Sequence, residues 1–150
     1  NGYSNTTRER LRGYVDAMTD SGLVVSDYNI HYGNLDRESG YKFGEMILKE
    51  DRGYTAVFCG NDLMADGLNR AFLDYGVRVP EDISIVCYDN TIISRSLDLT
   101  RVSSNPQKMG ERAVELLMRR IDNREADTQS ILFSPIILPG KSVMRRLPVK

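Results

Sequence analysis

The chain has 150 residues, 41% of them hydrophobic, which suits a single domain with a sizeable core. Its 20 basic and 21 acidic residues leave a formal net charge of -1, so this segment lacks the basic field that direct nucleic-acid binding requires. No apolar run approaches the roughly 20 residues that span a bilayer, and the first residues show no signal-peptide pattern, so we expect a cytoplasmic protein without a membrane segment.

The start of the chain predicts a helix over residues 7–21. Thr6 and Glu9 have the spacing of a capping box, and Gly22 follows the last turn of the pattern. The apolar residues of this helix recur at spacings of three and four, namely Leu11, Tyr14, Val15 and Met18.

An extended segment and a second helix are expected next. Residues 24–32 contain an alternation of apolar and polar side chains that predicts the extended segment, and a turn at 33–34 follows it. The second helix is expected to end near residues 51–53. Its apolar residues are Phe43, Met46 and Ile47.

Two short apolar runs, residues 55–59 and 83–88, predict strands that are buried on both faces of a parallel sheet. The helix between them has an apolar stripe that includes Leu68 and Phe72, and it ends at Gly76, where a left-handed backbone conformation is needed. These elements alternate along the chain. The alternation predicts an α/β fold, an open parallel sheet with helices on both faces.

The last long helix is predicted to start at Pro106, which favours the first position of a helix, with Asn105 as its N-cap. Its apolar residues are Met109, Ala113, Leu116, Leu117 and Ile121. A final apolar run over residues 131–138 ends the regular structure.

Polar side chains follow both predicted strands, where open parallel sheets bind their ligands. Asn61 and Asp62 come after the run at 55–59, and Asp89 comes after the run at 83–88. These side chains can give or accept paired hydrogen bonds, which suits a polyhydroxyl ligand.

Structural roles compete with ligand binding at each of these positions. Asp62 opens a helix and is expected mainly as a cap, whose carboxylate accepts hydrogen bonds from free backbone N–H groups. Asn61 could serve equally well as a turn former, and Asp89 could only stabilise its own turn. Arg10, in the first helix, would by default be a solvated surface charge.

Other kinds of site find less support. The single histidine, His31, has no Cys or His partner at ligand spacing, so we expect a solvated imidazole and neither a metal site nor a catalytic triad. No glycine-rich nucleotide-binding motif is present. The two cysteines, Cys59 and Cys87, lie in apolar runs and are expected to be buried, reduced thiols. We therefore expect neither an enzyme nor a cofactor.

Five sequence blocks, in register over essentially the whole chain, resemble the LacI/GalR family of transcriptional repressors. They are residues 10–14 (RLRGY), 60–67 (GNDLMADG), 76–90 (GVRVPEDISIVCYDN), 99–102 (LTRV) and 109–113 (MGERA). The resemblance implies a periplasmic-binding-protein-like core of type I, in which two α/β lobes hold an effector in the cleft between them.

The resemblance also implies a domain organisation. Residues 1–131 would form the C-terminal lobe of the effector-binding domain, and residues 132–150 would be returning strands and a tail that belong to the first lobe. The family's DNA-binding headpiece and most of the first lobe would lie outside this chain. Operator DNA would then be bound only through that N-terminal part, and two copies would form a homodimer.

Site residues follow from the same resemblance. Arg10 takes the place of an arginine that grips sugar hydroxyls, Asn61 that of an asparagine after the strand, and Asp89 that of the acid in the following turn. A guanidinium and a carboxylate can each engage two adjacent hydroxyls. Leu35 stands where members often place an aromatic ring that stacks on a sugar or purine face.

The implied function is effector sensing in a transcriptional repressor, with a sugar-like small molecule as the effector. Binding of the effector between the lobes would favour a closed arrangement and change how paired headpieces meet the operator. The candidates for a dimer interface are Ile92, Ile93 and Leu97, apolar residues in a loop-like segment, with a core-facing role as the alternative.

Two rival functions share the fold class. A periplasmic sugar-binding protein of a transporter would have the same cleft, although the phrase VPEDIS at residues 79–84 favours a regulator. An α/β hydrolase would need a catalytic base at the strand ends, where Asp62 and Asp89 lie without an accompanying nucleophile or metal cluster.

Overall fold

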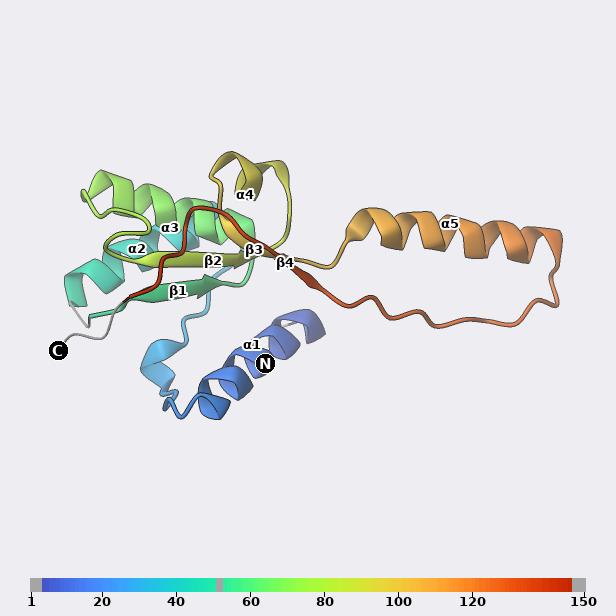
Figure 1. Ribbon diagram of the computed structural model, residues 1–150, viewed down its shortest axis with the longest axis horizontal. Coiled ribbons are helices and arrows are strands. Elements are labelled where there is room, and N and C mark those ends of the chain that lie inside the picture. The colour runs from blue at the N-terminus through green and yellow to red at the C-terminus, as the bar shows by residue number, and fades with distance from the viewer. Residues whose placement is uncertain (1–3, 51–52, 147–150) are drawn as a thin grey trace.

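The computed structural model describes residues 4–50 and 53–146 (Figure 1). In chain order, the elements are α1 (Asn5–Asp20), the 3-10 helix η1 (Asp27–Asn29), α2 (Arg37–Glu50), β1 (Ala56–Cys59), α3 (Asp62–Asp74), β2 (Ser84–Tyr88), α4 (Ile92–Ser96), β3 (Thr100–Ser103), α5 (Pro106–Asp122) and β4 (Ile136–Leu138). The strands form one sheet in the order β1-β2-β3-β4, in which the first three are parallel and β4 is an antiparallel edge strand. The predicted α/β fold with an open, mostly parallel sheet is confirmed.

Helices α2 and α3 lie together on one face of the sheet, and the hydrophobic core lies between them and the strands. Two glycines let the helix backbones touch: a Cβ on Gly40 would overlap the Met64 carbonyl, and one on Gly67 would overlap the Arg37 carbonyl. Each large apolar side chain buried here stabilises the fold by roughly 1.5–3 kcal/mol. The buried residues of the core are Ile47, Cys59, Ala65, Leu68, Phe72, Ile83, Ile85, Cys87 and Leu99.

Helix α1 is confirmed, but it begins earlier than the sequence predicts. Its N-cap is Ser4, whose hydroxyl accepts a hydrogen bond from the backbone N–H of Thr7. The predicted capping box at Thr6 is therefore wrong, because Thr6 already lies inside the first helical turn. Gly22 follows the helix with a φ of +72°, a left-handed conformation that suits glycine.

The segment over residues 24–32 contains η1, so the prediction of a continuous extended segment is wrong there. The cause is local, because Asn29 Oδ1 accepts hydrogen bonds from both the backbone N–H and the hydroxyl of Ser26. Side chains that bond to nearby backbone compete with the pairing that a strand needs. The chain therefore reaches α2 without adding a strand to the sheet.

Strand β1 is covered on only one face. Cys59 is buried on the side of α2 and α3, whereas Ala56 and Phe58 are exposed on the other side. The prediction that residues 55–59 are buried on both faces is therefore wrong. Helix α1 lies on the exposed side and stands away from the sheet (Figure 1), and all its residues are at least partly exposed.

Helix α4 and strand β3 connect the end of β2 to the edge of the sheet. The hydroxyl of Thr91 caps α4 by accepting a hydrogen bond from the backbone N–H of Ile93. The interpretation of residues 92–97 as a loop is therefore wrong. Strand β3 then pairs in parallel with β2, with Val102 opposite Tyr88.

Helix α5 begins as predicted, with Asn105 as the N-cap and Pro106 in the first turn. Figure 1 shows α5 and the segment after it projecting from the sheet as an arm, and the chain returns to the sheet at β4. The exposed large apolar residues of the helix are Met109, Val114, Leu117, Met118 and Ile121. The division of the chain at residue 131 stays a prediction.

The segment after β4 is fastened between two strands by a buried serine. The Ser142 hydroxyl donates to the Ile85 carbonyl and accepts from the backbone N–H of Thr100, and the Ser142 carbonyl accepts from the backbone N–H of Ile85. These three hydrogen bonds connect the segment after β4 to the starts of β2 and β3. Within the described residues, the helices lack the combination of length and apolar character that crossing a membrane demands.

Candidate functional site

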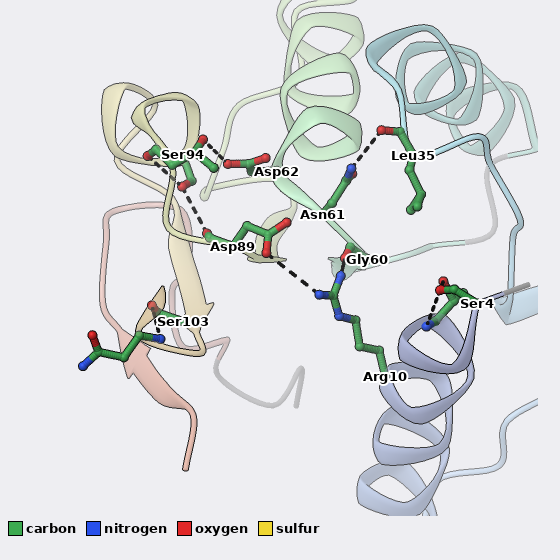
Figure 2. Close-up of polar contacts among 12 residues, drawn as sticks. Ser4, Arg10, Leu35, Gly60, Asn61, Asp62, Asp89, Ser94 and Ser103 are labelled. Atoms are coloured by element: carbon green, nitrogen blue, oxygen red, sulfur yellow. Dashed lines mark hydrogen bonds and ion pairs between the residues drawn. The ribbon is translucent and has the colours of Figure 1, made fainter. Parts of the chain in front are cut away.

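The carboxyl ends of β1 and β2 lie side by side, because Cys59 and Cys87 are paired in the parallel register. Gly60 follows the first strand and Asp89 follows the second, so both lie at one edge of the sheet. Arg10 reaches this edge from α1 (Figure 2). The structure thus brings together side chains from three distant parts of the chain.

Arg10 has contacts with three groups at this edge. Its Nη1 donates a hydrogen bond to the Gly60 carbonyl, its Nη2 lies 3.9 Å from Asp89 Oδ1, and its guanidinium carbon lies 3.6 Å from the centroid of the Tyr88 ring. The last contact is a cation–π interaction. The Arg10 side chain is only 22% exposed, so it is not the solvated surface charge that its helix position alone indicates.

One donor of Arg10 is left over. Its Nε is buried and has no hydrogen-bond partner among the residues that the structure describes. Buried polar groups are nearly always hydrogen-bonded, and an unsatisfied one calls for an explanation such as a ligand or water. Arg10 can therefore donate to an acceptor from outside the chain.

Asp89 is held in a left-handed backbone conformation, with a φ of +85°. Its N–H donates to the Val102 carbonyl on β3, and its carbonyl accepts from the hydroxyl of Ser94 on α4. Burial raises the pKa of the Asp89 carboxyl group and Asp62 raises it further, whereas Arg10 lowers it; the pKa is raised overall. The carboxyl group points toward Arg10 (Figure 2).

Asn61 is the N-cap of α3, because its Oδ1 accepts a hydrogen bond of 2.9 Å from the Met64 N–H. Its amide nitrogen donates to the carbonyl of Leu35, at 2.8 Å. Asn61 therefore links the loop before α2 to the edge of the sheet. An amide side chain has two donors and an acceptor oxygen with two lone pairs, so one N–H and one lone pair remain.

Asp62 does not cap α3, and that prediction is wrong. It is the first helical residue, one position after the N-cap, and its carboxylate accepts a hydrogen bond from the Thr91 hydroxyl instead. The residue is buried, with 4% of its surface exposed. Asp62 therefore joins the start of α3 to the start of α4.

A pocket of about 210 Å³ lies beside Arg10, between α1, the segment over residues 29–35 and β1. Leu35 lines it with a half-exposed side chain and has a φ of +61°. Arg10 and Gly60 line the same pocket, together with Tyr14 and Phe43. Arg10 is thus shared between the polar edge and a mainly apolar hollow.

The predicted interface residues fall at different depths. Ile92 is 68% exposed, Ile93 is half-buried, and Leu97 packs against the hydrophobic core. Leu97 therefore has the core-facing role that the sequence left open. A part for these three residues in a dimer stays a prediction.

The remaining singled-out residues have structural surroundings. The His31 ring packs on Phe43 with 4.6 Å between ring centroids, and its Nε2 lies 2.9 Å from the carbonyl of Tyr28, so His31 is not a free, solvated imidazole. Cys59 and Cys87 are free and buried, as predicted, and burial raises the pKa of both thiols, that of Cys87 to about 12. Over residues 4–50 and 53–146, no group of three metal-ligating side chains comes together.

Three residues at the site escape sequence reasoning, namely Tyr88, Thr91 and Ser94. Tyr88 ends a strand and reads as an ordinary core aromatic, and Ser94 lies inside a helix too short to show a pattern. Thr91 carries a detectable signal, because a threonine before two apolar residues is a helix N-cap pattern.

Comparison with protein families places this geometry in context. Residues 2–143 match the family described as "Periplasmic binding protein-like domain". The chain is similar to the HTH-type transcriptional repressor PurR of Pasteurella multocida, 40% identical over 144 residues, which are 95% of this chain and 43% of that protein. The repressor of the same name from Proteus mirabilis is 39% identical over 141 residues, 93% of this chain and 41% of that protein. The chain spans less than half the length of these curated relatives.

Solved structures show the same similarity. The Escherichia coli transcriptional repressor ascG has a TM-score of 0.84 and 28% identity, over 95% of this chain and 52% of that one. The complex of the transcriptional regulator CelR with cellobiose has a TM-score of 0.77 and 27% identity, over 89% of this chain and 42% of that one.

Proposed function

Because this chain belongs to the periplasmic binding protein-like domain family, as LacI/GalR-type regulators do, we propose that it is the effector-binding part of a transcriptional repressor. The observation that carries the proposal is the meeting of Arg10 and Asp89 at the carboxyl edge of the sheet, with a buried Arg10 Nε left without a partner. Such an edge is where open α/β sheets bind ligands.

The effector we propose is a small polyhydroxyl molecule, most simply a sugar. Arg10 supplies donors and Asp89 supplies an acceptor, and these are the two halves of hydrogen bonding to adjacent hydroxyls. The related regulator CelR has been solved with cellobiose, which is in keeping with this ligand class.

Two further residues complete the proposed site. Asn61 would contact the effector with the amide N–H and lone pair that α3 and Leu35 leave unused. Leu35, which lines the pocket, would offer an apolar surface rather than an aromatic ring for stacking. Asp62 would take part only indirectly, because its carboxylate is buried and accepts a hydrogen bond from Thr91.

The proposed mechanism is a shift of population between two arrangements of the whole protein. A second lobe outside this chain would supply the other wall of the cleft, and by the division that the resemblance implies, residues 132–150 would belong to it. An effector that touches both walls favours the closed arrangement only by its greater affinity for that arrangement. Operator DNA would be bound by a separate N-terminal part, in a homodimer to which Ile92 and Ile93 would contribute.

The comparisons favour this regulator over a transport protein with the same cleft, because the curated relatives are transcriptional repressors. They are not enzymes, and we propose no catalytic role for Asp62 or Asp89.

The direct test is substitution of the two converging residues in the intact protein. Arg10→Ala and Asp89→Ala should each abolish the response to the effector, because each removes one half of the hydrogen bonding, and leave operator affinity unchanged. The measurements are calorimetry with D-ribose, D-glucose and cellobiose, and fluorescence anisotropy with operator DNA.

Arg12→Ala is the matched control, since Arg12 lies on the same helix and is exposed beside Glu9. It should bind both effector and operator as the unchanged protein does. An unaltered effector response in both Arg10→Ala and Asp89→Ala would refute the site.

A further inference from the structure

Asp62 is a buried carboxylate with an unusual partner. Its side chain accepts a hydrogen bond from the hydroxyl of Thr91, 29 residues further along the chain. The cap of α3 is supplied by Asn61, so capping does not require Asp62. A buried carboxylate is costly unless it is hydrogen-bonded, and a position that served packing alone would be better filled by an apolar side chain.

Thr91 belongs to the turn that carries Asp89. Asp89 has a left-handed φ of +85°, which an L-residue keeps only where the surroundings determine it. The Val102 carbonyl on β3 accepts a hydrogen bond from the N–H of Asp89. The hydroxyl of the fully buried Ser94 donates to the carbonyls of Asp89 and Thr91. Among the hydrogen bonds of the described residues, only the one from Thr91 to Asp62 connects this turn to α3 (Figure 2).

The charged and titratable groups around the Asp89 turn come from four elements. Arg10 faces it from α1 and Asp62 from α3, and both affect its pKa. Cys87 lies on β2 and Arg101 on β3, where the Arg101 guanidinium bonds to Asn90. Asp62 therefore lies close enough to act on Asp89 through its charge as well as through the turn.

We propose that Asp62 and Thr91 form a positioning pair that fixes the Asp89 turn for effector binding, without touching the effector themselves. The inference rests on the proposed function of Asp89 as an effector contact. It gives Asp62 a different role from a helix cap or a direct ligand contact.

The test compares Thr91→Val and Thr91→Ser in the intact protein. Thr91→Val removes the hydroxyl that donates to Asp62 and also caps α4, and we expect about a ten-fold loss of affinity for whichever of D-ribose, D-glucose or cellobiose the unchanged protein binds. Thr91→Ser restores the hydroxyl and should recover the affinity. Ser96→Ala removes an exposed hydroxyl at the other end of the same short helix, so it is the matched control and should bind as the unchanged protein does.

A role confined to folding would not change the pH dependence. Asp62→Asn keeps an acceptor for Thr91 but removes the negative charge, so the acid-side loss of sugar binding should move to lower pH. The double variant Asp62→Asn with Thr91→Val should bind no more weakly than Thr91→Val, because the loss of the Thr91 hydroxyl already removes the hydrogen bond to position 62. Failure of Thr91→Ser to recover affinity, or an unmoved acid limb in Asp62→Asn, would overturn the inference.

A measurement without ligand separates this inference from the proposed function. Loosening the turn should speed amide hydrogen exchange at Asp89 in Thr91→Val, by about ten-fold, and leave it unchanged in Ser96→Ala. If the unchanged protein binds none of the three sugars, the proposed sugar function fails, and the exchange result alone decides the positioning pair. Unchanged exchange at Asp89 in a folded Thr91→Val protein would count against it.

Discussion

At the scale of single residues, the spacing between Arg10 and Asp89 decides what the site can accept. Their closest atoms are 3.9 Å apart, which is too long for a hydrogen bond. A hydroxyl group placed between them could accept from the guanidinium and donate to the carboxylate at the same time. The ion pair thus leaves room for a bridging ligand, and the Tyr88 ring keeps the guanidinium plane in place.

The raised pKa of Asp89 makes effector affinity dependent on pH. We expect affinity to fall as the pH is lowered from about 7 toward the pKa of a free aspartate, near 3.8, because protonation removes the acceptor at a higher pH than for a free carboxyl group. Since the folded pKa exceeds the unfolded one, protonation of Asp89 does not itself destabilise the fold. Calorimetry over this range measures the effect.

The control for this titration is Asp89→Asn, which should bind weakly at every pH and show a flat profile. A profile in the unchanged protein as flat as that of Asp89→Asn would show that this carboxylate takes no part.

At the scale of elements, length determines what the sequence could predict. Helices α2, α3 and α5 show two or more turns of periodicity, and Gly76 and Asn105 mark their ends, so they were predictable. The five residues of α4 are too few for a pattern, and its two isoleucines resemble a strand or loop. The exposed face of β1 could not be foreseen either, because a continuous apolar run does not reveal whether a helix covers both faces.

The segment after β4 offers a test at this scale. Ser142→Ala leaves the Ile85 carbonyl and the Thr100 N–H without their buried partner, which should lower the free energy of unfolding by about 1–3 kcal/mol. Ser21→Ala removes a hydroxyl whose bond to Ala17 is exposed, and should change it by less than about 0.5 kcal/mol. Urea unfolding followed by circular dichroism compares the two, and equal stability would mean that the segment does not fasten the strands.

At the scale of the whole molecule, the site was easier to predict than its supports. Parallel strands place Asn61 and Asp89 at one edge whatever else the fold does, so their proximity followed from the strand pattern. The approach of Arg10 required the resemblance to a family, because α1 lies some 50 residues earlier. Asn61 rather than Asp62 is the N-cap because α3 begins at Asp62. The sequence pattern does not fix the start of a helix to within one residue.

The chain by itself should be a poor receptor. Ligand sites normally enclose most of their ligand, and in the proposed cleft Arg10 and Asp89 belong to only one wall. We expect the isolated 150-residue chain, once shown by circular dichroism to be folded, to bind the effector at least about a hundred-fold more weakly than the intact protein. Calorimetry on both would decide, and equal affinities would contradict a cleft between two lobes.

The way the arm is attached limits how it can move. It leaves the sheet at Ser103 and returns at Ile136, and these residues are paired neighbours on β3 and β4. Because the arm is attached through two hydrogen-bonded strands, it can tilt together with them but cannot rotate about a single backbone bond. A tilt of the arm would move the peptide group between Val102 and Ser103. The Val102 carbonyl in that group accepts a hydrogen bond from the N–H of Asp89, so the base of the arm and the ligand-facing turn share one peptide group.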